Sequence, residues 1–103
     1  MQRLSRLNIQ NDKIVEFCQR NYIRKLSLFG SILRDDFGHT SDIDVLVEFK
    51  AGNIPGFIRL EGIEDELSKI IGGRRVDMNT PKSLSKYFRD EVMANSKVLY
   101  AEG

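Results

Sequence analysis

The segment from Asp42 to Phe49 limits what this chain can fold into more than any other. Its residues alternate in character, with Ile43, Val45, Val47 and Phe49 in one set and Asp42, Asp44, Leu46 and Glu48 in the other. This period of two predicts a β-strand with one face in a core and one largely polar face. Because side chains two positions apart on a strand share a face, Asp42 and Asp44 should project together from the polar side.

Helices and further strands are predicted around this strand. Helical spacing of apolar residues predicts helices over about 12–21, 57–71 and 84–95. Asn11 or Asp12 can cap the first helix, whose buried stripe should comprise Ile14, Phe17, Cys18 and Tyr22. Strands are predicted over 26–29, 74–79 and 97–100, and a brief helix should open at Ser31. Since both central strands keep a polar side, we expect an α/β or α+β fold with helices mainly on one face of the sheet.

Asp77 lies on the polar side of the strand predicted over 74–79. If this strand neighbours the first one, Asp42, Asp44 and Asp77 converge on the uncovered face of the sheet. Two unit charges about 4 Å apart repel by about 4 kcal/mol at an effective dielectric near 20, so the cluster needs a cation or protonation. Oxygen ligands with no His or Cys nearby favour Mg²⁺. By itself, Asp77 could equally be a surface partner of Arg74 or Arg75.

Gly30-Ser31, at the end of the strand predicted over 26–29, supplies an anion site. A glycine allows close approach of the backbone, and the amides that open a helix attract negative charge. Arg34 follows three residues later, on the same helical face as Ser31, and its guanidinium can bind a phosphate. Either Gly-Ser or Asp-x-Asp alone is often only structural, but together they predict a nucleoside triphosphate site that includes a metal.

Composition and charge limit the other classes of function. The 103 residues predict one domain over 1–103, and 16 basic against 15 acidic residues leave no charge footprint for nucleic acid or a membrane surface. Cys18 is the single cysteine, which excludes an intramolecular disulfide and a Cys-rich zinc site. No apolar run long enough for a membrane span occurs, so we expect a cytoplasmic protein.

The motifs resemble those of a known family. Gly30-Ser31, ten intervening residues, Asp42-Ile43-Asp44 and the later Asp77 are similar to the pattern of the DNA polymerase β type nucleotidyltransferases, and within them to the minimal nucleotidyltransferases of the MntA-like antitoxin group. The resemblance covers nearly the whole chain and implies a polymerase β-like core with a small mixed sheet. It implies that Asp42, Asp44 and Asp77 are catalytic and hold two Mg²⁺ ions, and that ATP is the substrate. The residues implied to bind the nucleotide are Gly30, Ser31, Arg34 and Ser41.

The resemblance also implies an acceptor outside this chain. In the minimal group the partner is a HEPN-type RNase toxin, whose hydroxyl group receives AMP from ATP, and the chain is expected to associate with it as an antitoxin. Two alternatives stay open: adenylyl transfer to a small molecule of the aminoglycoside type, and a non-catalytic antitoxin that acts by binding alone. Asp35, where the family pattern has a small residue, favours the last alternative, whereas the intact carboxylates favour an enzyme.

Overall fold

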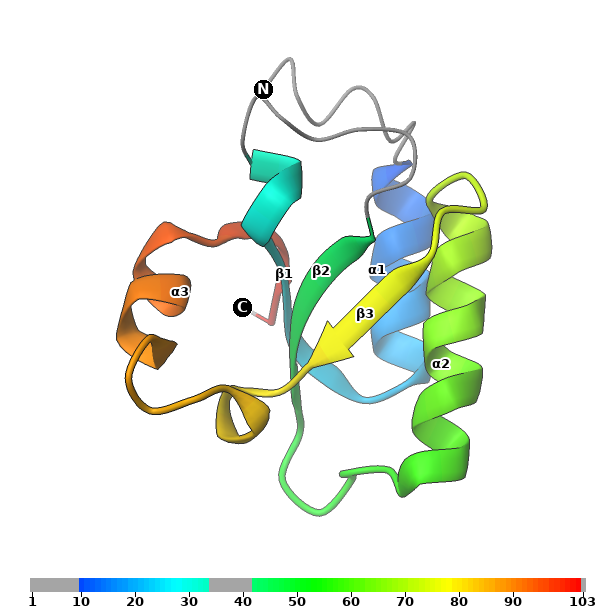
Figure 1. Ribbon diagram of the computed structural model, residues 1–103. Coiled ribbons are helices and arrows are strands. Elements are labelled where there is room, and N and C mark those ends of the chain that lie inside the picture. The colour runs from blue at the N-terminus through cyan, green and yellow to red at the C-terminus, as the bar shows by residue number, and fades with distance from the viewer. Residues whose placement is uncertain (1–9, 34–41, 103) are drawn as a thin grey trace.

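The fold is built on a four-stranded mixed sheet with the strand order β3-β2-β1-β4 (Figure 1). The computed structural model describes residues 10–33 and 42–102. The strands are β1 (Ile23–Phe29), β2 (Ile43–Phe49), β3 (Val76–Asn79) and β4 (Lys97–Ala101). β1 pairs antiparallel with β2 and with β4, and β2 pairs parallel with β3. The small mixed sheet and the α+β class predicted from the sequence are thereby confirmed.

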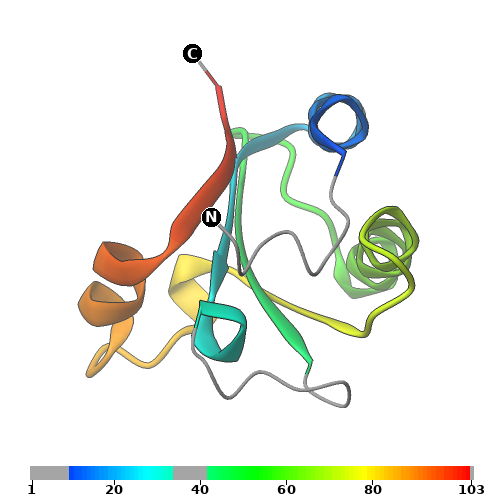
Figure 2. The same cartoon turned by 90° about the horizontal axis from the view of Figure 1, so that it is seen from above.

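The two longer helices cover one face of this sheet. α1 (Asn11–Arg20) and α2 (Phe57–Ile70) lie together on that face, and the short α3 (Arg89–Asn95) lies on the opposite side (Figures 1 and 2). Two single-turn 3-10 helices, η2 (Gly30–Leu33) and η3 (Pro81–Ser83), follow β1 and β3. Helices therefore lie mainly on one face, as predicted. Among the described residues, no helix is both long and apolar enough to cross a membrane.

The core lies between the sheet and the α1/α2 pair. From β2 it receives Ile43, Val45 and Val47, all fully buried, and from the helices it receives Phe17 and Leu67. Each large apolar side chain that is fully removed from water contributes about 1.5–3 kcal/mol to folding. This burial fixes which face of β2 points inward, so the even-numbered residues of β2 must point to the other side.

Cys18 belongs to this core, as predicted. It is fully buried on α1, and desolvation raises the pKa of its thiol from the usual 9.0 to about 12. Burial in an apolar environment disfavours the charged thiolate, so Cys18 is a neutral packing residue at physiological pH.

The opposite face of the sheet is less open than the sequence indicated. Ser27 of β1 and Leu46 of β2 are register partners on this face, and both are buried. α3 and η3 lie on this side of the sheet (Figures 1 and 2). The aspartates lie on this face at one end of β2 and β3, where Asp77 is exposed and Asp44 is half-buried.

Some predicted boundaries near the termini of the helices are wrong. α1 has Gln10 as its N-cap residue rather than Asn11 or Asp12, and its cap makes no side-chain hydrogen bond. Tyr22 lies beyond α1 in a left-handed conformation (φ 57°) and is 45% exposed, so it is not part of the buried stripe. β1 begins at Ile23, earlier than predicted, because Ile23 is buried and pairs with Phe49 of β2.

The third helix is also shorter than the 84–95 predicted. Leu84 is extended and buried, and the amide of Tyr87 donates to the hydroxyl of Ser85 at 3.3 Å. A serine side chain that hydrogen-bonds the local backbone competes with helix formation, and burial of Leu84 favours the extended chain. α3 consequently begins only at Arg89.

Candidate active site

Asp44 and Asp77 lie side by side on the face of the sheet opposite α1 and α2. They are register partners in the parallel pair of β2 and β3. Their flanking residues are buried in the core, which turns both aspartates to the other face. Neighbouring strands run about 4.8 Å apart, so the two carboxylates share one small region of surface. Asp44 is half-buried and Asp77 is exposed.

Asp42 has a different position from the other two. It precedes β2, is exposed, and lines a hollow of about 450 Å³ at the β3 edge together with Asp77 and residues of α2. Asp44 does not line this hollow. Within residues 10–33 and 42–102, no three carboxylate, imidazole or thiol groups are grouped closely enough to hold a metal ion. The structure thus pairs Asp44 with Asp77 and Asp42 with Asp77, and the role of the three residues as metal ligands stays a prediction.

Glu64 holds the strand that carries Asp77. The Oε2 atom of this α2 residue accepts a hydrogen bond of 2.8 Å from the amide of Met78. β3 is an edge strand, so this amide has no strand on its outer side to pair with. The bond from α2 takes the place of a missing neighbour and fixes β3, and with it Asp77, against the rest of the sheet.

Gly30 meets Asp44 directly at the end of β1. Gly30 has a φ of +77°, a conformation that other residues adopt only at a cost. A Cβ atom at this position would lie 2.3 Å from Oδ2 of Asp44 and 3.1 Å from its Cγ. Only glycine leaves room for the carboxylate here. The predicted anion-binding turn and the predicted catalytic strand are therefore in contact, through two residues that lie 14 positions apart in the sequence.

The structure describes the other predicted nucleotide-binding residues only in part. Ser31 belongs to η2, the brief helix expected after Gly30, but its side chain is not among those described. Arg34, Asp35 and Ser41 lie outside the part of the chain that the structure describes. Their assigned roles stay predictions.

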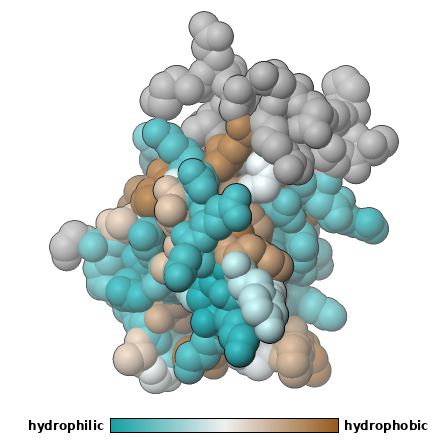
Figure 3. All heavy atoms as spheres, turned by 60° about the vertical axis from the view of Figure 1, so that its left-hand side comes forward, coloured by the Kyte–Doolittle hydropathy of each residue, from teal (hydrophilic) through white to brown (hydrophobic). Residues whose placement is uncertain are grey.

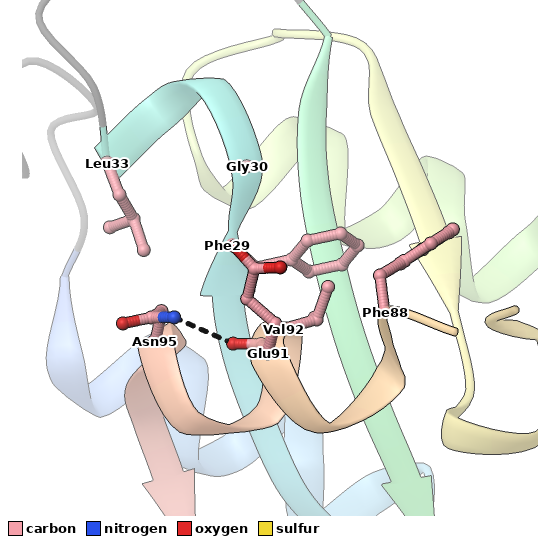
Figure 4. A pocket seen from close by; sticks show the side chains of 7 residues that line it. All are labelled: Phe29, Gly30, Leu33, Phe88, Glu91, Val92 and Asn95. Atoms are coloured by element: carbon pink, nitrogen blue, oxygen red, sulfur yellow. Dashed lines mark hydrogen bonds between the residues drawn. The ribbon is translucent and has the colours of Figure 1, made fainter. Parts of the chain in front are cut away.

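A cavity of about 590 Å³ lies beside Gly30, and sequence reasoning missed it (Figure 4). Phe29, Gly30 and Leu33 line it from the end of β1 and η2, and Phe88, Glu91, Val92 and Asn95 line it from α3 and the residue before it. The only signal in the sequence was the four-residue spacing of Phe88 and Val92, which indicates a shared helix face but not what that face meets. On the molecular surface of the α3 side, apolar residues appear between hydrophilic ones (Figure 3).

A comparison with protein families identifies this chain. Residues 12–102 match the model of the family described as polymerase beta, nucleotidyltransferase. The chain belongs to this nucleotidyltransferase family. The match confirms the resemblance inferred from Gly30-Ser31 and Asp42-Ile43-Asp44.

Two curated relatives point to one activity within the family. The chain is 32% identical over 81 residues to a candidate protein adenylyltransferase of Methanocaldococcus jannaschii, MJ0435, which covers 79% of this chain and 84% of that protein. It is 33% identical over 69 residues to the protein adenylyltransferase MntA of Thermococcus cleftensis, which covers 67% of each. Both relatives thus carry the name of an enzyme that adenylylates proteins.

Solved structures share the fold. A crystal structure of a toxin-antitoxin with AMP-PNP superposes with a TM-score of 0.70 at 22% identity, over 91% of this chain and 75% of that one. A structure of a tri-AMPylated Shewanella oneidensis HEPN toxin in complex with an MNT antitoxin superposes with a TM-score of 0.62 at 21% identity, over 89% of this chain and 70% of that one. At these identities the likeness establishes a common fold.

Proposed function

We propose that this chain is a protein adenylyltransferase that transfers AMP from ATP to a hydroxyl group of a partner protein, a HEPN-type toxin, and thereby acts as its antitoxin. The observation that carries the proposal is the pair of Asp44 and Asp77 in register on one face of the sheet, with Asp44 against Gly30. The names of the curated relatives and the AMPylated toxin in a structure of the same fold support it.

In the proposed reaction the partner's hydroxyl oxygen attacks the α-phosphorus of ATP. A new phosphorus–oxygen bond forms, the bond between the α-phosphorus and the α–β bridging oxygen breaks, and pyrophosphate leaves with that electron pair. The proton of the hydroxyl passes to a carboxylate, for which we propose Asp77, because it is exposed on the edge strand where a second protein can approach. A positioned general base typically contributes about 10²–10⁴-fold to the rate.

Mg²⁺ fits the chemistry of the donors at this place. Asp44 and Asp77 offer hard oxygen ligands on neighbouring strands, and the lack of a side chain at Gly30 leaves room for the carboxylate of Asp44. We propose that Asp42, Asp44 and Asp77 hold two ions, and that Gly30, Ser31, Arg34 and Ser41 bind the phosphates. When bound, the ions would neutralise the charge that develops on the phosphate oxygens.

The proposal treats residues 1–103 as one nucleotidyltransferase domain that works in association with its partner. The family model supports this, because its match runs through every described strand and helix from residue 12 to residue 102. The reaction would take place in the cytoplasm, where ATP and Mg²⁺ are abundant.

Intact-mass analysis of the partner tests the proposal. The product of the neighbouring gene, which the proposal expects to be a HEPN-type protein, is incubated with the chain, ATP and Mg²⁺, and we expect its mass to increase by one or more AMP groups. Asp44→Asn and Asp77→Asn should each slow the transfer about 100-fold or more. The matched control is Asp65→Asn, which removes an exposed carboxylate of α2 from the hollow that Asp77 lines and should leave the rate unchanged.

Two other results would support the alternative functions instead of protein adenylylation. An unmodified partner that is nevertheless neutralised, equally well by the double variant Asp42→Asn/Asp44→Asn, would mean that the chain acts by binding alone. Transfer of AMP to aminoglycosides in a parallel reaction, with no transfer to the protein, would make it a small-molecule adenylyltransferase.

A further inference from the structure

The cavity beside Gly30 is continuous with the candidate active site. Gly30 lines the cavity and at the same time touches the carboxylate of Asp44. Phe29, which also lines the cavity, is the register partner of Asp44 in the antiparallel pair of β1 and β2. Residues directly opposite each other on antiparallel strands share a face of the sheet, so the wall formed by Phe29 stands next to Asp44. A ligand with its phosphates at Gly30 would therefore have its remaining atoms at the mouth of this cavity.

The walls of the cavity suit a flat, apolar ring system. Four of the seven lining residues are apolar, and two of these, Phe29 and Phe88, are aromatic. The volume of about 590 Å³ lies within the range of small-molecule sites and exceeds what a single amino-acid side chain fills. Phe88 lines the cavity and is 46% exposed, so part of this residue is accessible to a ligand.

The polar groups of the cavity come from α3. Asn95 donates a hydrogen bond of 2.9 Å from Nδ2 to the carbonyl oxygen of Glu91, which fixes the plane of its amide (Figure 4). An amide nitrogen carries two hydrogens and the amide oxygen accepts two more bonds. With one Nδ2 hydrogen bonded to Glu91, the second hydrogen and the Oδ1 atom of Asn95 are available to pair with adenine, which presents an acceptor at N7 beside the donor at N6. Guanine presents two acceptors on the same edge and pairs less well with an amide.

We propose that this cavity binds the base of the nucleotide donor, with adenine stacked against Phe88 or Phe29 and its edge read by Asn95. The inference rests on the proposed function only in taking the donor to be a nucleoside triphosphate. It assigns the selection of the base to α3 and the residue before it, separate from the phosphate residues of η2 and from the carboxylates of β3 and of the segment from Asp42 to Asp44. An aromatic side chain of the acceptor protein is the other occupant that this volume could receive, and the test distinguishes the two.

Titration calorimetry of the full chain with Mg²⁺ and three ligands tests the assignment. The ligands are ATP, GTP and inorganic tripolyphosphate, which carries the phosphates without a base. ATP should bind at least tenfold more tightly than tripolyphosphate. Stacking of a base on an aromatic residue is typically worth about 1–3 kcal/mol, so Phe88→Ala should weaken ATP about fivefold or more and leave tripolyphosphate unchanged.

Two further variants test the base selectivity and the occupancy of the cavity. Asn95→Ala should reduce the preference for ATP over GTP about fivefold or more. Val92→Trp places a large side chain in part of the cavity, where it should obstruct the base and lower the affinity for ATP toward that for tripolyphosphate. The matched control is Tyr87→Ala, which removes the neighbouring aromatic ring. Tyr87 is 89% exposed and does not line the cavity, so this variant should bind all three ligands like the parent. Circular dichroism confirms that each variant is folded.

The other possible results would each overturn the assignment of the base, the proposed function, or both. Equal affinity for ATP and tripolyphosphate, or variants that leave the affinity for ATP unchanged, would overturn the assignment of the base. If those variants instead weaken binding of the acceptor protein, the cavity receives the acceptor. Cavity variants that weaken ATP in a chain that transfers no AMP would refute the proposed function and leave the inference standing, and failure of all three ligands to bind would refute both.

Discussion

Replacement of Gly30 by alanine should lower both the stability of this protein and its rate of AMP transfer. Two effects act at this position. The φ of +77° is a left-handed conformation, which costs an L-residue about 1–2 kcal/mol. The new Cβ atom would also lie 2.3 Å from Oδ2, 3.1 Å from Cγ and 3.3 Å from Cβ of Asp44. Rotation of the Asp44 side chain can relieve the contacts with Oδ2 and Cγ, but it turns the carboxylate away from its present position, and the Cβ atom must still shift by a few tenths of an ångström.

The size of both effects can be estimated. Forcing an extra atom into a filled site typically costs about 1–3 kcal/mol, so together with the backbone term Gly30→Ala should lower the free energy of unfolding by about 2–5 kcal/mol. A domain of this size usually has about 5–15 kcal/mol, so the variant should still fold. A displacement of about 1 Å at a reacting group can lower a rate about 100-fold, and we expect a loss of that order in AMP transfer.

Gly52→Ala is the matched control. Gly52 has a φ of +82°, close to that of Gly30, but no atom lies within 4 Å of its added Cβ among those compared. Gly52→Ala should therefore show the backbone cost of about 1–2 kcal/mol with unchanged transfer. Thermal unfolding followed by circular dichroism measures the first quantity, and intact-mass analysis of the partner measures the second. If Gly30→Ala transferred AMP as fast as Gly52→Ala, the contact between Gly30 and Asp44 would have no role in catalysis.

Three further predictions concern stability. Glu64→Ala removes the bond to the amide of Met78 and should lower the free energy of unfolding in urea by about 1.5–3 kcal/mol, whereas the exposed Glu61→Ala should change it by less than about 0.5 kcal/mol. Thr80→Ala removes the capping box of η3 and should cost about 1 kcal/mol in the same measurement. The pKa of Cys18 is about 12 in the folded chain against 9.0 when exposed, so between these values only the unfolded chain loses the proton, and unfolding becomes easier as the pH rises. The difference in unfolding free energy between the parent and Cys18→Ala should therefore fall by about 1.4 kcal/mol per pH unit above pH 9, and a difference independent of pH would contradict the buried neutral thiol.

Much of the fold followed from local patterns. The alternation in β2 and the apolar stripe of α2 were strong predictors of secondary structure because each pattern runs over many residues and has a buried side, which includes Val45 and Leu67. The ends of elements were harder to predict. The position of Leu84 inside the protein overrides the helical pattern of the segment around it, and that burial depends on neighbours distant in the sequence.

The candidate site was predictable to a similar extent. That Asp44 and Asp77 share a face followed from the period of two in each strand, but their pairing required the strand order, which no local pattern contains. The contact between Gly30 and Asp44 likewise depends on the register of β1 against β2. The cavity under α3 was missed because a cavity is defined by elements that meet, and Phe29 and Asn95 lie 66 positions apart.

The sequence by itself determined the family and the class of chemistry and predicted the residues that would carry it, because Gly-Ser, Asp-x-Asp and the apolar alternation around them are properties of short segments. Tertiary structure decided which of these residues touch. It placed Asp44 over Gly30 and beside Asp77, left Asp42 at the edge of the sheet, and formed a cavity between the turn at Gly30 and α3. The physical reason is that side-chain direction follows from backbone periodicity, whereas contact between segments depends on strand order, register and packing across the whole chain.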